Sequence, residues 1–406
     1  MKVLQINSVC GIGSTGRIAT DLADVIRENG GVCKIAYGRG HAVANCETIK
    51  IGNQTDVLLH VALSRITDKH GLYSKSFTKE FIKKLKEYDP DVIHLHNIHG
   101  YYINYKLLFD YIKQENKPVV WTLHDCWSFT GHCSHFDLQG CNRWKKGCHD
   151  CPLKTEYPAS LVLDNSQNNY AIKKQTFTGV ENMTIVTPSQ WLSDLAKQSF
   201  LQEYPIKVIN NGIDLMRFAP LPSNVKEKLG IEGKKIILGV ATAWSNKKGY
   251  KDFIRLSRRL PKSYVIVLVG LDEDKIKELP HNVIGIERTN NVEELAELYT
   301  AADVFLNPTY EDTFPTTNLE AMACGTPVIT YPTGGSPESI ADGCGFVVKK
   351  GSVKEIYERI REIVQNTKEA YCDTCIKNVQ ENYNKQDCYL KYYNLYSQIT
   401  NSEEVL

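Results

Sequence analysis

The chain has 406 residues, of which 42% are hydrophobic and 23% charged, as is ordinary for a soluble globular protein of two or three domains. Its 48 Lys and Arg residues balance 47 Asp and Glu residues, and a net charge of +1 argues against bulk electrostatic binding of nucleic acid. No apolar run approaches the roughly 20 residues of a membrane-spanning helix, and the first residues lack the apolar core of a secretory signal. We therefore expect a cytoplasmic protein.

Short apolar runs alternate along the chain with longer stretches of helical periodicity. This alternation predicts parallel sheets covered by helices on both faces, with ligands bound at the carboxyl ends of the strands. The predicted strands are Val3–Ile6, Val32–Ala36, Val92–His94, Val119–Thr122, Ile185–Thr187, Lys207–Ile209, Ile236–Val240, Val265–Val269, Val283–Ile286, Val304–Leu306, Val328–Thr330 and Phe346–Val348. The predicted helices include Gly16–Glu28, Phe77–Lys86, Asn104–Gln114, Gln190–Ser199, Tyr250–Leu260, Val292–Thr300, Thr316–Ala323, Ser352–Gln365 and Lys385–Ile399.

The alternating series breaks after Asn210, where an Asn-Gly pair is followed by two nearby prolines. A new series begins at Ile236. We therefore expect one α/β domain over residues 1–210 and another over residues 211–384. Residues 385–406 form a last segment with four tyrosines at helical spacing, which we interpret as a packing face.

A glycine-rich loop, Gly11-Ile-Gly-Ser-Thr-Gly16-Arg17, follows the first strand. Gly13 and Gly16 would let the backbone approach a phosphate, and Arg17 could reach one from the start of the next helix. The spacing departs from the strict dinucleotide-binding pattern, and no acid ends the second strand. Alone, the loop is a weak indicator, and a solvated cation on the helix face is the alternative for Arg17.

Histidines mark the ends of two predicted strands. His124 follows Val119–Thr122 and could donate a hydrogen bond to a sugar hydroxyl, although a satisfied strand-end histidine is the alternative. His94 and His96 alternate along the preceding strand and so point to one face. For that pair, packing is a better interpretation than metal binding.

Cysteines cluster in a stretch from about 126 to 157. Cys133, Cys141, Cys148 and Cys151 could bind a structural zinc ion and so hold a loop that has little core of its own. Reduced buried thiols and redox or cluster chemistry are the alternatives, because only one CxxC pair is present. Four thiolates would leave no open position on the metal, so such a site would be structural.

The second half carries lysines and glycines at strand-to-helix turns. Lys247 and Lys248 follow the strand Ile236–Val240 and could neutralise a diphosphate, with solvated loop lysines as the alternative. Two glycines that would allow close backbone approach precede Ser336, which could cap a helix; a plain capped turn is the alternative there.

The most informative stretch is residues 307–327, in which Asp312 is followed eight positions later by Glu320. The predicted helix that begins at Thr316 offers unpaired N–H groups and a positive dipole end, which suit a phosphate. The two carboxylates can accept hydrogen bonds from sugar hydroxyls. The alternative is an ordinary capped helix with solvated acids.

Together these motifs resemble the retaining glycosyltransferases of family 4, which have the GT-B architecture of two Rossmann-like, doubly wound domains facing a cleft. The resemblance covers nearly the whole chain, and its most specific string is Leu319-Glu-Ala-Met-Ala-Cys-Gly-Thr-Pro-Val-Ile. It implies an N-terminal acceptor domain, a C-terminal donor domain and a last helix that crosses back to the first domain. The cysteine-rich insert and the segment from His94 to Tyr102 resemble a subgroup of bacterial capsule and O-antigen biosynthesis enzymes.

The resemblance also implies roles for individual residues. Asp312 would contact the donor sugar and Glu320 the ribose, Lys248 would neutralise the diphosphate, and His124 would contact the transferred sugar. The other donor-binding residues that it implies are Gly13, Gly16, Arg17, Lys247, Phe314, Thr316, Thr317 and Ser336. The chain departs from the family pattern where Ala243 replaces an arginine, Asp312 a glutamate and Pro315 a glycine.

The implied reaction is transfer of a hexosyl or N-acetylhexosaminyl unit from a UDP- or GDP-linked sugar to a saccharide or lipid-linked saccharide, with retention of anomeric configuration. The implied setting is cell-surface polysaccharide biosynthesis. No DxD-type site is evident, so we expect no catalytic metal. A non-hydrolysing nucleotide-sugar epimerase is one alternative, but it needs an acid–base pair that we cannot assign. A non-catalytic binding module is the other, and the neutral charge disfavours nucleic acid as its ligand.

The helix predicted near Lys75–Tyr88 is amphipathic, with Phe77, Phe81, Leu85 and Tyr88 on one face and lysines around it. This pattern resembles an interfacial helix and would suit peripheral contact with the inner face of the cytoplasmic membrane and a lipid-linked acceptor. Packing of that face on the sheet is the alternative that we favour.

Overall fold

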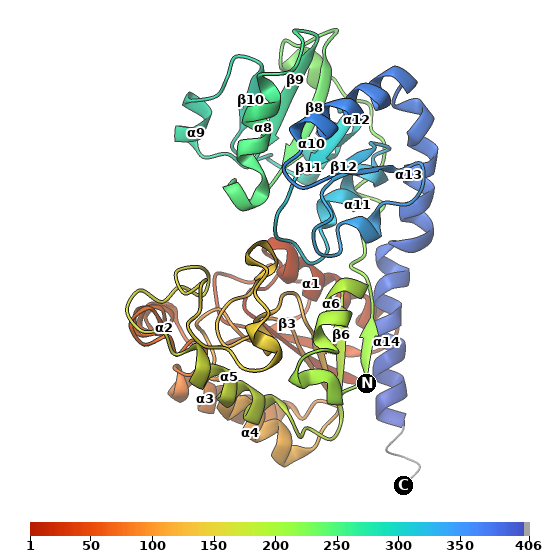
Figure 1. The fold of residues 1–406 in the computed structure, drawn as a ribbon. Helices are drawn as coiled ribbons and strands as arrows, with labels where there is room; N and C mark the ends of the chain where they lie inside the picture. The colour runs from red at the N-terminus through yellow and green to blue at the C-terminus, as the bar shows by residue number, and fades with distance from the viewer. Residues whose placement is uncertain (402–406) are drawn as a thin grey trace. The chain divides into compact units, whose positions relative to one another are not determined.

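The computed structural model describes residues 1–401, which divide into two compact units. Unit 1 contains residues 1–210 and the chain from Cys388 onward, and unit 2 contains Asn211–Asp387. Each unit holds one parallel sheet with helices on both of its faces (Figure 1). This confirms the predicted fold class of two parallel-sheet α/β domains.

Unit 1 contains a seven-stranded sheet of order β3-β2-β1-β4-β5-β6-β7, in which every neighbouring pair is parallel. Strands β2 and β3 extend the sheet to one side of β1, and β4 to β7 extend it to the other side. Ligands of such sheets bind at the carboxyl ends of the strands that flank this change, here β1 and β4. The strands are β1 (Lys2–Asn7), β2 (Val32–Tyr37), β3 (Glu47–Lys50), β4 (Val92–Leu95), β5 (Val119–Thr122), β6 (Met183–Thr187) and β7 (Ile206–Val208).

The helices of unit 1 include α14, which returns from unit 2 to pack on the sheet. Tyr389, Tyr392 and Tyr396 of α14 are buried, as expected of a packing face, and the Tyr396 hydroxyl is 2.6 Å from His94 Nδ1. The helices are α1 (Gly13–Glu28), α2 (Gln54–Thr67), α3 (Lys75–Tyr88), α4 (Tyr105–Glu115), α5 (Ser166–Phe177), α6 (Gln190–Ala196) and α14 (Lys385–Asn401), with 3-10 turns η1 (Trp127–Phe129), η2 (Asp137–Gln139), η3 (Arg143–Lys145) and η4 (Phe200–Glu203).

Unit 2 contains a six-stranded parallel sheet of order β10-β9-β8-β11-β12-β13, with the reversal between β8 and β11. Its strands are β8 (Lys235–Val240), β9 (Tyr264–Val269), β10 (Val283–Ile286), β11 (Val304–Asn307), β12 (Val328–Thr330) and β13 (Gly345–Val347). Its helices are α7 (Val225–Lys228), α8 (Tyr250–Ser257), α9 (Glu273–Lys277), α10 (Val292–Ala301), α11 (Thr316–Ala323), α12 (Val353–Asn366) and α13 (Glu369–Asn382), with turns η5 (Asn246–Lys248) and η6 (Pro337–Ser339).

The amphipathic helix α3 packs its apolar face inside unit 1. Phe81 and Leu85 are buried, and Phe77 and Tyr88 are half-buried. That face is not available to a bilayer, so the interpretation of α3 as an interfacial helix is wrong and the packing alternative holds. Among residues 1–401, no helix is both long enough and apolar enough to cross a membrane.

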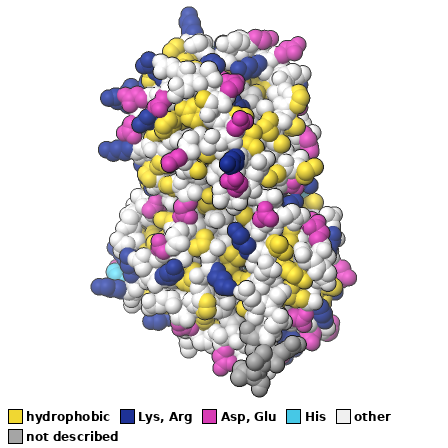
Figure 2. Space-filling view, turned by 90° about the vertical axis from the view of Figure 1, so that its right-hand side faces the viewer, with side chains coloured by type: hydrophobic (Ala, Val, Ile, Leu, Met, Phe, Trp, Pro, Cys, Tyr) yellow, Lys and Arg dark blue, Asp and Glu magenta, His cyan; other side chains and the backbone are white. Residues whose placement is uncertain are grey.

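Charges of both signs are interspersed with hydrophobic side chains on the face of the molecule drawn in Figure 2. Such mixing agrees with a net charge of +1. This face therefore lacks the single-sign field that would steer a polyanion.

Candidate functional site

The lysine-bearing turn of unit 2 packs against the loop that follows β11. Gly249 ends this turn with φ of 77°, and a Cβ added there would lie 2.3 Å from the Pro308 carbonyl oxygen. The Tyr310 N–H donates to the Lys247 carbonyl at 2.7 Å. The loops after β8 and β11, which adjoin in the sheet, thus form one surface at the carboxyl ends of these strands.

Two ion pairs join these loops. Lys248 Nζ lies 2.8 Å from Asp312 Oδ2, and Lys247 Nζ lies 2.8 Å from Glu311 Oε2. The Glu311 side chain is 6% exposed, whereas that of Lys248 is 40% exposed. Lys248 is therefore accessible to a ligand, and an incoming phosphate would compete with Asp312 for its charge.

Helix α11 begins at Thr316, directly after this pair. Its N-cap residue, Pro315, offers no side-chain hydrogen bond, so the first N–H groups of the helix lack a side-chain cap. Thr316 and Thr317 are half-buried, whereas Phe314 is buried with its ring centroid 5.7 Å from that of Tyr383. The structure thus leaves a positive helix end four residues after Asp312, the partner of Lys248, and places the Phe314 ring in the core.

Glu320 lies one helical turn further along α11. It is 6% exposed, and its Oε2 accepts a hydrogen bond from the Tyr299 hydroxyl at 2.8 Å. This contact fixes the carboxylate, because Tyr299 itself is fully buried.

The glycine turn after β12 packs on the backbone beside Asp312. Gly334 has φ of 53°, a Cβ there would lie 1.8 Å from the Asp312 carbonyl oxygen, and the Gly335 N–H donates to the Thr313 carbonyl at 3.0 Å. Ser336 is completely buried, and its hydroxyl has no hydrogen-bond partner in the described structure. Ser336 takes the N-cap position of η6, but its hydroxyl makes no capping hydrogen bond.

Asp252 of α8 is a residue of this region that the sequence analysis missed. Its Oδ2 accepts hydrogen bonds from the Tyr310 hydroxyl at 2.7 Å and the Tyr331 hydroxyl at 3.0 Å. Burial, together with the Asp252 carboxylate, raises the pKa of Tyr310 to about 12. Asp252 therefore ties α8 to the loops after β11 and β12.

In unit 1, a chain of hydrogen bonds leads from His124 into the sheet. His124 Nε2 lies 3.0 Å from His96 Nδ1, and His96 Nε2 lies 2.8 Å from Gln5 Oε1. Burial lowers the pKa of His124 to about 4, although the charge of Asp125 opposes this shift. His124 is therefore neutral near pH 7, and its Nε2 is held by His96. His94 and His96 face one side, as predicted, and serve packing.

A second chain of contacts includes Asp125, His99 and Tyr157. His99 Nε2 lies 3.0 Å from Asp125 Oδ2, and His99 Nδ1 lies 3.0 Å from the Tyr157 hydroxyl. Burial raises the pKa of Asp125, but the charge of His99 outweighs burial and the pKa falls to about 2. The sequence analysis missed His99 and Tyr157, which link the end of β5 to the cysteine-rich insert.

The first glycine loop is more closed than the sequence suggests. Gly16 is buried and its carbonyl accepts a hydrogen bond from the Gly11 N–H at 3.0 Å, so Gly16 closes the loop on itself. Gly13, with φ of 67°, has open space where a Cβ would lie, and Arg17, the fifth residue of α1, is exposed. Of these residues, Gly13 and Arg17 remain accessible to a ligand.

The buried histidines of unit 1 predict a marked acid sensitivity. Burial lowers the pKa of His60 to about 3 and that of His124 to about 4, and it holds the pKa values of His94 and His96 well below 6.5. Between pH 6.5 and 4 these histidines bind protons in the unfolded chain but stay neutral in the folded protein. The stability of the fold is therefore complete above pH 6.5 and declines as the pH falls below it. We expect the free energy of unfolding to fall by up to about 1.4 kcal/mol per pH unit for each such histidine.

Denaturant titrations at pH 7, 6 and 5 measure this effect. A free energy of unfolding that stays constant between pH 7 and pH 5 would contradict it. Replacement of His41, a histidine on the surface, serves as the comparison for replacements of the buried histidines.

The four cysteines of the insert line one small cavity together with Phe136 and Trp144. Within residues 1–401, no group of three or more Cys, His, Asp or Glu side chains is arranged to hold a metal ion, so the geometry does not support the predicted zinc site. Instead, Cys133 and Cys151 are hydrogen-bonded to each other, and this contact lowers the pKa of Cys151 to about 7. The Gly131 N–H donates to Cys148 Sγ at 3.1 Å.

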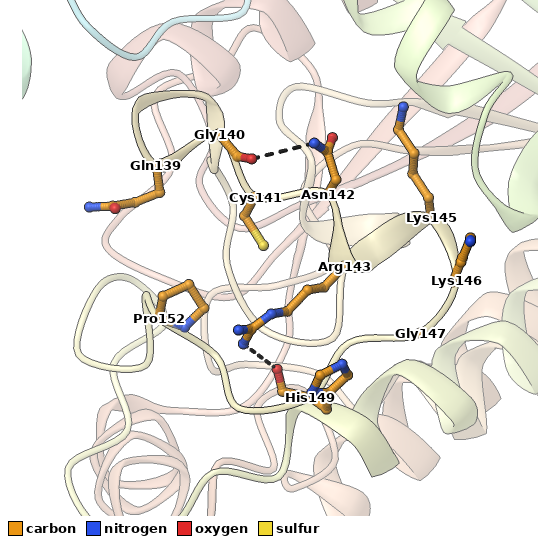
Figure 3. Close-up of a pocket in the computed structure, with 10 residues that line it drawn as sticks. All are labelled: Gln139, Gly140, Cys141, Asn142, Arg143, Lys145, Lys146, Gly147, His149 and Pro152. Carbon is orange, nitrogen blue, oxygen red and sulfur yellow. Dashed lines mark hydrogen bonds between the residues drawn. The ribbon is translucent and has the colours of Figure 1, made fainter.

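An open depression on the insert lies beside these cysteines, between residues 139 and 152 (Figure 3). Cys141 lines both the depression and the cavity. Arg143 donates to the His149 carbonyl at 2.8 Å and so closes the loop that surrounds the depression.

Comparison with known proteins agrees with the division into two units. The family described as "Glycosyltransferase Family 4" matches residues 16–217, and that described as "Glycosyl transferases group 1" matches residues 223–382. The chain is 26% identical over 383 residues to a protein of Escherichia coli (strain K12) that is provisionally named colanic acid biosynthesis glycosyl transferase WcaC. That match covers 88% of this chain and 90% of the E. coli protein.

Solved structures show the same fold at low sequence identity. Sucrose-phosphate synthase from Thermosynechococcus elongatus has a TM-score of 0.74 at 16% identity, covering 99% of both chains. Anabaena HepE in complex with UDP-glucose has a TM-score of 0.66 at 17% identity, covering 100% of both chains. Together these findings define a glycosyltransferase of the GT-B fold. The chain belongs to the glycosyltransferases with a family 4 domain followed by a group 1 domain.

Proposed function

We propose that the protein transfers a hexosyl or N-acetylhexosaminyl unit from a UDP- or GDP-linked sugar, bound in unit 2, to a saccharide or lipid-linked saccharide in the cytoplasm. The observation that carries the proposal is the ion pair of partly exposed Lys248 with Asp312, which lies four residues before the N-terminus of α11, where no side chain caps the helix. A cation and a helix end together suit a diphosphate. HepE, whose structure contains UDP-glucose, and the E. coli relative named for colanic acid biosynthesis favour this donor class and a role in cell-surface polysaccharide biosynthesis.

In this proposal, the leaving nucleoside diphosphate develops negative charge as the bond to the sugar breaks. Lys248 and the N–H groups near Thr316 and Thr317 stabilise that charge, and preorganised groups of this kind usually make the largest contribution to catalysis. Asp312 contacts the donor sugar and Glu320 accepts hydrogen bonds from the ribose. His124 and Asp125 mark the acceptor end of unit 1, where a neutral imidazole can orient a sugar hydroxyl without adding charge.

Retention of anomeric configuration is the finer part of the proposal. NMR of the first product formed from an α-linked nucleotide-sugar tests it, and an α-linked product is the expected result. A β-linked product would exclude retention while leaving the donor class intact.

The reaction is expected to need no divalent metal, since in this proposal the cationic Lys248 and the N-terminus of α11 supply positive charge to the diphosphate. Turnover in excess EDTA should therefore stay within about twofold of turnover in Mg²⁺. A fall of tenfold or more in EDTA that Mg²⁺ or Mn²⁺ reverses would assign the leaving-group role to a metal and contradict the proposal.

A further inference from the structure

The hydrogen-bond chain that leads from His124 into the sheet ends on a group that can only accept a hydrogen bond. Gln5 of β1 is completely buried, and its amide nitrogen lies 2.8 Å from the Ala19 carbonyl oxygen of α1. A carbonyl oxygen carries no proton, so the Gln5 amide nitrogen must be the donor in this contact. The contact therefore fixes the orientation of the Gln5 amide, and the amide oxygen is the atom that faces His96.

The Gln5 amide oxygen in turn fixes the proton of His96. It lies 2.8 Å from His96 Nε2, and because an amide oxygen also only accepts, Nε2 must carry the proton. His96 is 1% exposed, and burial holds its pKa well below 6.5, so its ring is neutral near pH 7 and has a single N–H. His96 Nδ1 is therefore unprotonated and can only accept a hydrogen bond.

The rings of His96 and His124 are oriented as an N–H···N hydrogen bond requires. His124 Nε2 lies 3.0 Å from His96 Nδ1, and the two ring planes differ by 13°. Both the N–H bond and the lone pair of an imidazole lie in the plane of the ring, so nearly parallel rings let one point at the other. His94, whose ring centroid is 4.0 Å from that of His96, offers no competing partner, because its nitrogens contact Thr122 and Tyr396.

These constraints leave one arrangement of protons on His124. Its pKa of about 4 means that the ring is neutral near pH 7 and carries one proton. That proton lies on Nε2, which donates to His96, so Nδ1 carries a lone pair. His124 is half-buried at the end of β5, whereas Gln5 and His96 are buried, so groups in the interior set the state of a side chain nearer the surface.

We propose that Gln5 and His96 are positioning residues that fix the tautomer of His124, so that its Nδ1 accepts a hydrogen bond from a substrate hydroxyl. This direction is the reverse of the donor role that the sequence suggested for His124. An unprotonated Nδ1 favours an O–H group over a group that can only accept, such as an ether, carbonyl or phosphate oxygen. The assignment of the hydroxyl to a sugar rests on the proposed function, whereas the tautomer does not.

Nitrogen-15 NMR of the full-length protein with labelled histidine measures the tautomer. The signals of His124, identified by their loss in His124→Gln, are expected near pH 7 to show a protonated Nε2 and an unprotonated Nδ1. A coupling across the hydrogen bond between His124 Nε2 and His96 Nδ1 is expected as well. A proton on His124 Nδ1 would overturn the inference, whether or not the protein binds a nucleotide.

Replacing Gln5 by methionine tests the positioning role. The variant keeps a side chain of similar length but removes the acceptor for His96, so both tautomers of His124 should be populated. Tyr396→Phe is the matched control, because it removes a hydroxyl from His94 in the same buried layer and leaves the chain from Gln5 to His124 intact. An unchanged tautomer in Gln5→Met, or an equal change in both variants, would refute the positioning role. Circular dichroism shows whether the variants fold, and the wild-type spectrum decides the tautomer even if Gln5→Met does not.

Analogues of the accepted nucleotide-sugar test the direction of the hydrogen bond to substrate. Fluorine cannot donate, so at the hydroxyl that His124 binds, the deoxy and the deoxyfluoro analogue should both lower kcat/KM by about three- to tenfold. The penalty should disappear in His124→Ala. A His124-dependent penalty that the deoxyfluoro analogue does not suffer would show that His124 donates, and would overturn the inference. If no nucleotide binds but NMR finds the expected tautomer, the proposed function fails and the positioning by Gln5 and His96 stands.

Discussion

Replacing Lys248 by alanine is expected to lower kcat/KM for the nucleotide-sugar by about 10²–10³-fold, which corresponds to about 3–4 kcal/mol of transition-state stabilisation. Lys248 is a partly exposed cation paired with Asp312, which lies four residues before the start of α11. Without Lys248, the negative charge that develops on the departing diphosphate is not stabilised by this cation. Steady-state kinetics with the purified variant measure the change, and most of it should appear in kcat because the charge develops in the transition state.

A matched control separates this effect from a general loss of positive charge. Lys251 is exposed on the first turn of α8, three residues from Lys248. Lys251→Ala should keep kcat/KM within about threefold of wild type, since surface substitutions away from a site rarely matter. Turnover of Lys248→Ala close to that of wild type, in a folded protein, would exclude the role that we give to this lysine.

Replacing Glu320 by alanine is expected to raise the KM for the donor by about 10–100-fold, with a smaller change in kcat. A hydrogen bond to a charged group contributes about 1.5–3 kcal/mol, and the ribose is distant from the bond that breaks, so this is binding energy shared by ground and transition states. Initial rates over a range of donor concentrations measure the KM. The same rates with the free nucleoside diphosphate as inhibitor should show a parallel rise in its inhibition constant.

Tyr299→Phe is the control for this variant. It removes the hydroxyl that donates to Glu320 Oε2 but keeps the carboxylate. Its KM should rise by less than about tenfold, because the carboxylate can still accept a hydrogen bond from the donor. An equal rise in both variants would mean that Glu320 acts on packing, and no rise in either would remove Glu320 from the donor site.

The sheet strands and α11 were accessible from the sequence because their local signals are strong. Buried parallel strands appear as continuous apolar runs, and the helix Thr316–Ala323 was predicted with the bounds that the structure shows. The edge strand β3, Glu47–Lys50, was missed because it is short and mostly exposed, so it has no apolar run. Helix α2 was missed because it buries few residues and exposes several leucines, so its amphipathic pattern is weak.

Contacts between distant residues account for most of what the sequence could not show about the candidate site. The pairing of Lys248 with Asp312 depends on how two loops pack, and the two residues are 64 positions apart. The burial of Ser336 and the position of the Phe314 ring in the core depend in the same way on tertiary packing. Cysteine spacing suggested a metal site, but spacing alone cannot show how the thiols lie in the fold, where Cys133 and Cys151 are hydrogen-bonded to each other.

The claim that unit 2 binds a nucleotide-sugar is tested most directly by a thermal-shift panel of nucleoside diphosphates and nucleotide-sugars, with and without chelator. A ligand that binds only the folded state at 100 times its Kd adds about 2.7 kcal/mol of stability. The account predicts a selective rise in Tm with UDP or GDP and their sugars that EDTA does not change, and in Lys248→Ala a smaller rise with the free diphosphates. The absence of a shift with every nucleotide would contradict it and would make the pair Asp312 and Glu320 part of an ordinary helix end.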